Sequence, residues 1–260
     1  MSTLSPPGTA SLPMYDFDWL RPAHDRLWAA IAEALGSAGL DAPSVLTRAT
    51  DVHALWHDPN LLLSQSCGWP LVTELDGQVS TIGTFAYDIP SSDESDGWYR
   101  SAIVTPGGAA ADSSGPVAVN SVASLSGWIS LRVALGIDEH SRTVVLTGSH
   151  VASLAALRDG RAAVAAIDGV THALIARDDP TLLDGLAVIG RGPRIPCLPI
   201  VGPVSWDPAT IEVVRHAIDA AVRRDDLADV RTALLIRRFM PLERADYGPL
   251  RHLVDEKTVA

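Results

Sequence analysis

Serine side chains gather in the stretch AVNSVASLSGW, residues 118–128, where an apolar segment gives way to a helix-like run. Ser121, Ser124 and Ser126 therefore lie close to the start of the expected helix. The first backbone N–H groups of a helix lack partners within the helix, and the helix dipole is positive at that end. Hydroxyl and N–H donors at this place suit an oxyanion. The alternative is ordinary capping, in which a serine accepts from its own helix and nothing binds.

A second group of polar residues stands where later strands are expected to end. VLTGSHVASL places Ser149 and His150 at a helix start, and AAVAAIDGVTHAL places Asp168 where a buried strand meets a helix. Open α/β sheets bind their ligands at strand ends. A carboxylate beside an anion is repulsive unless a positive group, such as a ligand amine or a protonated His150, lies between them. The alternative is that Asp168 caps the helix that follows it.

The N-terminal part of the chain repeats this arrangement. PMYD places Tyr15, and LLLSQSCGWPL places Ser64, Gln65 and Ser66, at expected strand ends. Each residue alone is typical of a cap or a turn. Together with the serine-rich helix starts they predict two rims of neutral donors that face one another across a cleft.

Motifs for catalysis and metal binding are missing from the sequence. It contains no GxSxG elbow, no P-loop and no GxGxxG, so we predict no cofactor. His53 and His57 have the i, i+4 spacing of a metal pair, but no third ligand has a matching spacing, and we favour a solvated helix face. Ser149, His150 and Asp168 suggest a triad only superficially, because their order and surroundings match no nucleophile arrangement.

The two cysteines, Cys67 and Cys197, are far apart and form no CxxC motif. We expect two free thiols, with a disulfide only if the fold brings the two residues together.

Length and charge set limits on the protein class. The chain has 260 residues, of which 47% are hydrophobic, so it can bury a large core. A net charge of −11 disfavours nucleic acid or an anionic membrane as the main partner. The N-terminus lacks the pattern of a secretory signal, and no segment is apolar enough to span a membrane. We therefore expect a cytoplasmic protein as written, or a periplasmic one if the sequence is a truncated form.

The elements that must position these residues alternate along the chain. We expect strands at residues 11–15, 44–48, 61–65, 79–87, 98–106, 116–120, 142–148 and 162–168. We expect helices at residues 21–40, 50–58, 149–160, 169–178, 207–222 and 225–236, besides the serine-fronted helix. This alternation predicts parallel sheets with right-handed crossovers. The proline-dense segment GPRIPCLPIVGP, residues 192–203, is poor material for a central strand and suits a connection.

The sequence thus predicts an α/β protein of two Rossmann-like lobes joined by two crossings. Lobe one would contain residues 1–96 and 200–260, and lobe two residues 97–199, with a ligand cleft between the lobes.

A family resemblance covers nearly the whole chain. The succession of LPMYD, LLLSQSCGWPLV, YRSAIV, VAVNSVASLSGW, TGSHVASLAALRDGRAAVAAIDGVTHAL and RFMPLERADYGPL resembles the phosphate/phosphonate (PhnD-like) substrate-binding proteins of ABC transporters. The resemblance implies a type 2 periplasmic-binding-protein fold. It also implies that hydroxyls and amides at helix starts hold the anion, here Ser121, Ser124, Ser126, Ser149 and His150.

The same resemblance implies roles for two further residues. An acidic residue at the position of Asp168 serves ligands that carry an amine, and Tyr15 matches an aromatic residue of the first lobe. The chain departs from the family in its lobe-one loop, SQSCGWP, where a tyrosine-bearing loop is expected, and in lacking an export signal.

We therefore expect a solute-binding protein that captures a small oxyanion by hinge closure, for ABC-type uptake or sensing, and that performs no chemistry. Its partners would be a small anionic ligand and an ABC permease or a sensor protein. The alternative is a cytoplasmic enzyme on the same fold that acts on a small anionic metabolite, with Asp168 or His150 as its acid or base.

Overall fold

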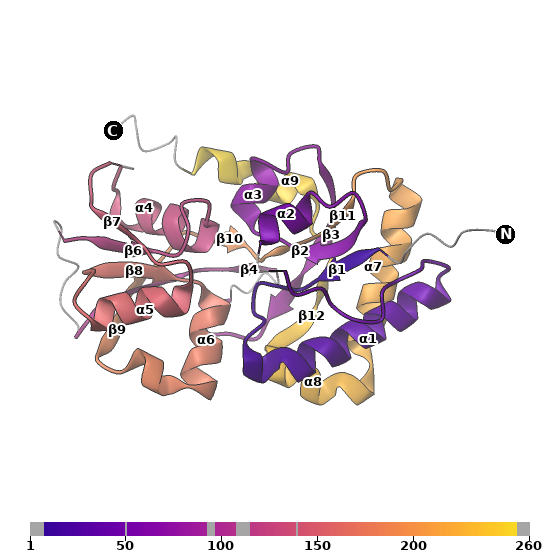
Figure 1. Ribbon diagram of the computed structural model, residues 1–260, viewed down its shortest axis with the longest axis horizontal. Coiled ribbons are helices and arrows are strands. Elements are labelled where there is room, and N and C mark those ends of the chain that lie inside the picture. The colour runs from indigo at the N-terminus through magenta and orange to yellow at the C-terminus, as the bar shows by residue number, and fades with distance from the viewer. Residues whose placement is uncertain (1–7, 50, 93–96, 108–114, 139, 254–260) are drawn as a thin grey trace. The chain divides into compact units, whose positions relative to one another are not determined.

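The computed structural model describes residues 8–49, 51–92, 97–107, 115–138 and 140–253 (Figure 1). The chain divides into two compact units. Unit 1 comprises Met1–Tyr87 and Cys197–Tyr247, and unit 2 comprises Asp88–Pro196 and Gly248–Ala260. From the sequence we expected the boundaries between residues 96 and 97 and between residues 199 and 200. We also expected the whole C-terminal segment to belong to the first lobe.

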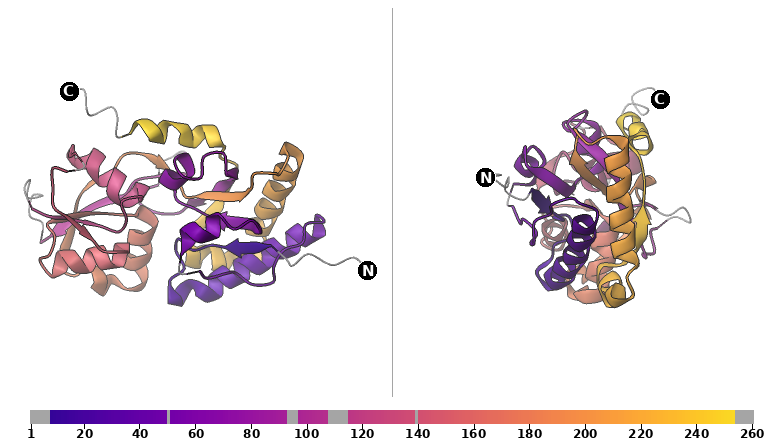
Figure 2. Two further views of the ribbon diagram at one scale, coloured as in Figure 1. Left: turned by 45° about the horizontal axis from the view of Figure 1, so that its top comes forward. Right: turned by 90° about the vertical axis from the view of Figure 1, so that its right-hand side faces the viewer.

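Unit 1 is built on a five-stranded sheet with the strand order β1-β2-β11-β3-β12. These strands are β1 (Thr9–Ser11), β2 (Leu61–Gln65), β11 (Pro199–Pro203), β3 (Val79–Tyr87) and β12 (Ile236–Met240). Its α-helices are α1 (Arg21–Ser37), α2 (Val52–Trp56), α3 (Gly68–Val72), α7 (Pro208–Arg223), α8 (Ala228–Leu234) and α9 (Arg244–Tyr247). Both views in Figure 2 show the indigo α1 beside the orange α7.

The proline-dense segment forms a central strand, which corrects our expectation of a connection. β11 lies between β2 and β3 and is antiparallel to both. Its prolines, Pro199 and Pro203, occupy the first and last positions of the strand. Because a proline lacks only its N–H, it can end a strand without breaking the ladder inside it.

Two further expectations for unit 1 were wrong. Residues 44–48 form no strand, although their composition is typical of one. The helix expected to reach residue 236 ends as α8 at Leu234, and Leu235 follows in the left-handed conformation with φ 55°. The chain then turns into β12, which pairs with β3.

Unit 2 contains a second five-stranded sheet with the strand order β7-β6-β8-β5-β9. These strands are β7 (Val144–Leu146), β6 (Val117–Val119), β8 (Val164–Ile167), β5 (Ala102–Pro106) and β9 (Leu186–Arg191). A separate two-stranded ladder joins β4 (Trp98–Tyr99) to β10 (Ile195–Pro196). The helices are a π-helical turn (Leu125–Ile129) that runs into α4 (Ser130–Leu135), α5 (His150–Arg158) and α6 (Gly169–Asp178).

Both sheets are mixed rather than parallel, which corrects the expectation drawn from strand–helix alternation. In unit 2, β6 is parallel to β7 and β8, whereas β5 is antiparallel to β8 and β9. In unit 2 the strand that runs against its neighbours is β5, which follows β4 directly and without a crossover helix, so alternation did not apply to it.

The core of unit 2 places its helix starts at one edge of the sheet. α5 and α6 lie on one side of the sheet and α4 on the other (Figure 1). Leu154 and Leu157 of α5 and Ile175 of α6 pack on Ala165 and Ile167 of β8. Since β6 and β8 are parallel, the residues that follow them emerge at the same edge. No helix among the described residues is long and apolar enough to cross a membrane.

Candidate functional site

The serine-rich segment begins the predicted helix, and two of its serines act as caps. Ser124 is the N-cap of the turn Leu125–Ile129, and its Oγ accepts a hydrogen bond from the Gly127 N–H at 3.0 Å. The Ser121 Oγ accepts from the Ala123 N–H at 3.2 Å. The capping alternative is therefore realised at Ser124, whereas Ser121 closes the turn that precedes the helical segment. The hydroxyl hydrogens of both serines stay available to other acceptors.

Ser126 differs from these two serines because its side chain caps nothing. Its Oγ lies 3.3 Å from Nε2 of His150, which is the first residue of α5. Ser126 is buried, with 5% of its surface exposed. The contact joins the start of one helix to the start of another.

His150 is electrically neutral at neutral pH. Burial lowers its pKa below 6.5, while the charge of Asp168 and a hydrogen bond to the Ala166 backbone act in the opposite direction. A neutral imidazole can either donate to or accept from the Ser126 hydroxyl. Ser149, its neighbour, caps α5 by accepting from the Ala152 N–H at 3.1 Å.

Asp168 uses both carboxylate oxygens inside unit 2. Its Oδ1 accepts from the Val170 and Thr171 N–H groups at 2.9 and 3.0 Å, which makes it the N-cap of α6. Its Oδ2 accepts from the Tyr99 hydroxyl at 2.5 Å. Asp168 is 2% exposed. The capping alternative is thus realised here as well, and the sequence analysis overlooked Tyr99.

A close contact beneath the serine-rich helix start involves a residue that the sequence analysis quoted but did not select. A Cβ atom on Gly127 would lie 1.9 Å from Oδ1 of Asn120. That oxygen is buried and makes no hydrogen bond to the residues that the structure describes. The absence of a side chain at Gly127 therefore lets Asn120 approach the helix start. An asparagine as the last residue of a predicted strand was the signal that could have pointed to it.

The candidate residues of unit 1 are buried at the end of β2 and next to it. The Ser64 Oγ donates to the Gln65 carbonyl at 3.1 Å, and the Gln65 Nε2 donates to the Tyr87 hydroxyl at 3.1 Å. Ser66 is fully buried, and its N–H donates to the Pro199 carbonyl at 2.8 Å.

Tyr15 and Gln65 meet through Tyr87. The Tyr15 ring packs edge-on against the Tyr87 ring, with the ring centroids 5.5 Å apart. All three residues line one small cavity with His24. Tyr87 ends β3, so the strand-end rule that selected Gln65 would also have selected Tyr87.

The remaining sequence candidates show no further site. No disulfide joins Cys67 and Cys197. His53 Nδ1 lies 2.6 Å from Glu74 Oε1 on the surface. The described residues contain no group of three or more His, Cys, Asp or Glu side chains arranged to hold a metal.

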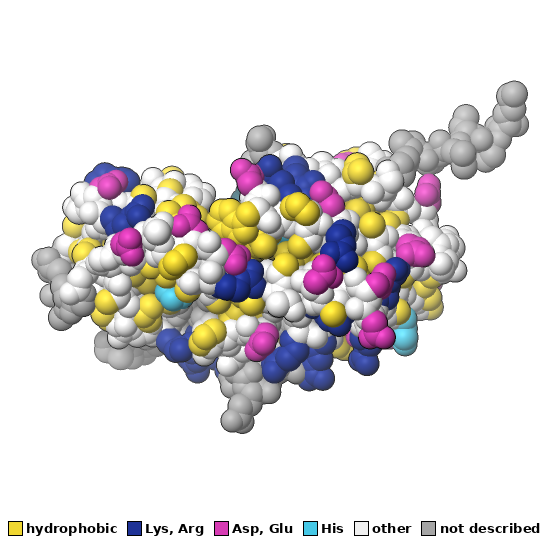
Figure 3. Space-filling model, turned by 90° about the horizontal axis from the view of Figure 1, so that it is seen from below, with side chains coloured by type: hydrophobic (Ala, Val, Ile, Leu, Met, Phe, Trp, Pro, Cys, Tyr) yellow, Lys and Arg dark blue, Asp and Glu magenta, His cyan; other side chains and the backbone are white. Residues whose placement is uncertain are grey.

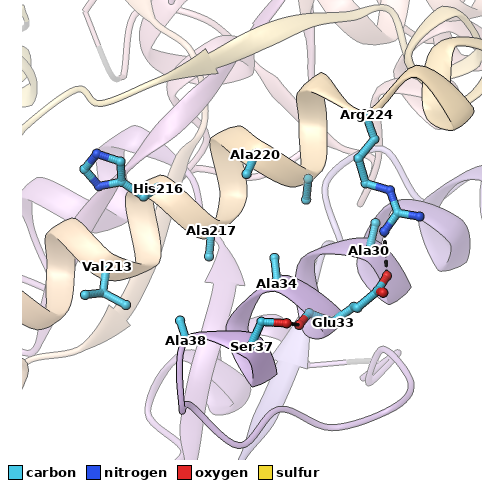
Figure 4. A pocket seen from close by; sticks show the side chains of 11 residues that line it. Ala30, Glu33, Ala34, Ser37, Ala38, Val213, His216, Ala217, Ala220 and Arg224 are labelled. Atoms are coloured by element: carbon cyan, nitrogen blue, oxygen red, sulfur yellow. Dashed lines mark hydrogen bonds and ion pairs between the residues drawn. The ribbon is translucent and has the colours of Figure 1, made fainter.

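One groove of unit 1 is unsuited to an anion. It has a volume of about 590 Å³ and lies between α1 and α7, where its walls are mostly alanine (Figure 4). Its one arginine, Arg224, forms an ion pair with Glu33 at 2.5 Å. Acidic and arginine side chains both occur on the face seen in Figure 3.

The fold defined by these elements is the type 2 periplasmic-binding-protein fold. XAC2383 from Xanthomonas citri, solved with chloride and with ATP, superimposes on the chain. For the chloride complex the TM-score is 0.71 at 12% identity, over 96% of this chain and 97% of that one. PhnD1 from Prochlorococcus marinus, in complex with methylphosphonate, gives a TM-score of 0.71 at 11% identity. The match covers 98% of this chain and 100% of PhnD1. A binding protein component of an ABC phosphonate transporter from Pseudomonas aeruginosa gives a TM-score of 0.72 at 14% identity. This match covers 97% of this chain and 87% of that one.

The sequence itself identifies the family. Residues 84–247 match the family described as ABC transporter, phosphonate, periplasmic substrate-binding protein. The chain belongs to this family, which confirms the PhnD-like resemblance and the expectation of a solute-binding protein. No curated protein matches the chain in sequence.

Proposed function

We propose that the solute is a small phosphorus oxyanion, a phosphonate or phosphate, and that unit 2 holds it at the start of the Leu125–Ile129 turn. The observation that carries the proposal is the contact between Ser126 and His150, each at the N-terminal end of a helical segment. Neither side chain is used to cap a helix.

The physical chemistry of this place suits an anion without a lysine. Each helix N-terminus contributes about 0.3–1 kcal/mol toward a negative charge. Each hydrogen bond to a charged group contributes about 1.5–3 kcal/mol. The hydroxyls of Ser121, Ser124 and Ser126 and the imidazole of neutral His150 are all able to donate.

The comparisons support the ligand class and the partner. The family is that of phosphonate ABC transporters, and PhnD1 was solved with methylphosphonate. We infer that the protein delivers its ligand to an ABC permease in the periplasm. The alternative partner is a sensor protein. In this proposal Tyr15, Ser64, Gln65 and Ser66 supply further contacts to the ligand. Nothing in the comparisons favours the enzyme alternative.

Calorimetric titration with inorganic phosphate, methylphosphonate and 2-aminoethylphosphonate tests the proposal. We expect at least one of these anions to bind. Ser126→Ala and His150→Gln should each weaken its affinity by about tenfold or more, since one charge-assisted hydrogen bond is lost. Ser141→Ala is the matched control, because this exposed serine of unit 2 bonds only to the Asp138 backbone. If no phosphorus oxyanion binds, or if both site variants bind like the wild type, the proposal is wrong.

A further inference from the structure

A cavity of unit 2 lies between α6 and the edge strand β9. Its volume is about 460 Å³, within the range of small-molecule sites. Gly169, Ala173 and Ala176, spaced one helical turn apart, line it from α6, and Ala102 and Val188 line it from β5 and β9. Small residues thus face one another where larger side chains would fill the space.

The register of the sheet explains why both apolar and basic side chains reach this cavity. Ala102 pairs with Arg191, and Val104 pairs with Val188, across an irregularity that adds one residue to β9. Because of this bulge, Val188 and Arg191 point to the same face of the sheet as Ala102. An arginine is thereby placed beside an apolar wall.

Two of the three basic side chains of this cavity have no counter-charge among the described residues. Arg177 lines the cavity but forms two bonds to the Asp178 carboxylate, at 2.6 and 2.7 Å. Arg191 and His172 also line it, and the side chain of neither forms a hydrogen bond or ion pair within the part of the chain that the structure describes. They lie close enough together that the Arg191 charge, in addition to burial, lowers the pKa of His172.

This lack of partners is unusual in the protein. The chain has a net charge of −11, and its other large groove holds an arginine that is already paired. An arginine and an imidazole without partners at the rim of an apolar cavity favour a guest with one anionic end.

We propose that this cavity is a second ligand site, which binds a small organic anion with an apolar body. The body lies between α6 and β9, and the carboxylate, sulfonate or phosphate group contacts Arg191 and His172. An inorganic anion alone is disfavoured here, because it would lose hydration against alanine and valine walls without enough donors to replace the water. None of the residues assigned to the oxyanion site lines this cavity.

Two dyes that differ chiefly in charge test the proposal. The probe is 8-anilinonaphthalene-1-sulfonate, and N-phenyl-1-naphthylamine is the same apolar ring system without the sulfonate. We expect both dyes to bind with enhanced fluorescence, the sulfonate more tightly. Arg191→Gln should weaken the affinity for the sulfonate dye by about tenfold or more and change the affinity for the neutral dye by no more than about twofold. Arg161→Gln is the matched control, since this exposed arginine of unit 2 pairs with Asp159 elsewhere.

A second pair of variants fills the cavity rather than changing its charge. Ala173→Leu should abolish the binding of both dyes, whereas Ala155→Leu on α5, outside the cavity, should not; circular dichroism verifies that each variant is folded. If Arg191→Gln and Arg161→Gln bind the sulfonate equally, the site is wrong. It is also wrong if methylphosphonate displaces the dye or if Ser126→Ala removes it, because the dye then occupies the oxyanion site. These outcomes leave the proposed function itself untouched.

Discussion

At the scale of single residues, caps and ligand contacts use the same side chains. Ser124 and Asp168 were selected because oxygen-bearing residues at helix starts suit ligands, and both prove to cap their own helices. Ser126 was selected for the same reason and caps nothing. Sequence could not separate these cases, because serine and aspartate are favoured at caps for the very property that suits a ligand. Only the geometry shows which groups are already engaged.

Asp168 gives the sharpest prediction at this scale. Asp168→Asn keeps a cap oxygen but removes the charged acceptor of the Tyr99 hydroxyl, so we expect a loss of about 1–3 kcal/mol in the free energy of unfolding in urea. We expect the ratio of the affinities for methylphosphonate and 2-aminoethylphosphonate to stay unchanged, because both carboxylate oxygens serve unit 2.

Tyr99→Phe is the control for this prediction, since it breaks the same hydrogen bond from the other side. It should cost a similar free energy and leave the same affinity ratio. A loss of affinity confined to the amino ligand in Asp168→Asn would show instead that the carboxylate contacts the ligand amine.

At the scale of elements, the serine-rich helix start depends on one glycine. Gly127→Ala would bring a Cβ to within 1.9 Å of Asn120 Oδ1, so the turn or the asparagine must move. We expect a loss of about 1–3 kcal/mol in stability and a loss of phosphonate affinity of about tenfold or more. Thermal unfolding and calorimetry measure the two effects separately.

Gly36→Ala on α1 is the matched control for this substitution. No atom lies within 4 Å of the Cβ it would add, and alanine is a better helix former than glycine, so stability should rise or stay constant. If Gly127→Ala binds phosphonate like the wild type, the helix start does not depend on this close contact.

The elements that sequence predicted well are those with a strong local signal. β3 spans the predicted residues 79–87, and α6 spans the predicted residues 169–178, because β-branched residues, an aspartate cap and helical periodicity agree there. β11 was missed because its prolines suggested a break, although they stand only at its ends. β12 was missed because its position is decided by pairing with β3, a contact between residues far apart in sequence.

At the scale of the whole molecule, the fold and the family could be predicted, whereas the state of each site residue could not. The alternation of elements and the order of the motifs belong to the whole chain and survive errors in single elements. The side chains of His172 and Arg191 line the same cavity only because a bulge in β9 turns Arg191 to the face covered by α6. No local pattern in the sequence marks that bulge, so the cavity between α6 and β9 became visible only in the structure.

Both units also contain buried histidines, which together give the molecule a dependence on pH. Burial is the main cause that lowers the pKa of His24 in unit 1 and of His150 and His172 in unit 2 below 6.5. Above pH 6.5 these groups are neutral in both the folded and the unfolded chain and contribute no pH dependence. Below it the unfolded chain takes up protons that the folded chain does not, until the lower folded pKa is reached. The free energy of unfolding should therefore fall between pH 6.5 and 5.5, by up to about 1.4 kcal/mol per pH unit for each histidine.

Urea unfolding at pH 7.5, 6.5 and 5.5 measures this dependence. Carboxylates such as Asp58, whose pKa is lowered by hydrogen bonds from Asn60 and Thr9, lose their stabilising effect only below about pH 4, outside the histidine range. His24→Gln should flatten the slope between pH 6.5 and 5.5, because His24 is 4% exposed and its imidazole is shielded from water in the folded chain. The exposed His57→Gln should leave the slope as it is. A slope equal in both variants and in the wild type would mean that His24 takes up its proton within the folded chain, by opening of α1 or entry of water.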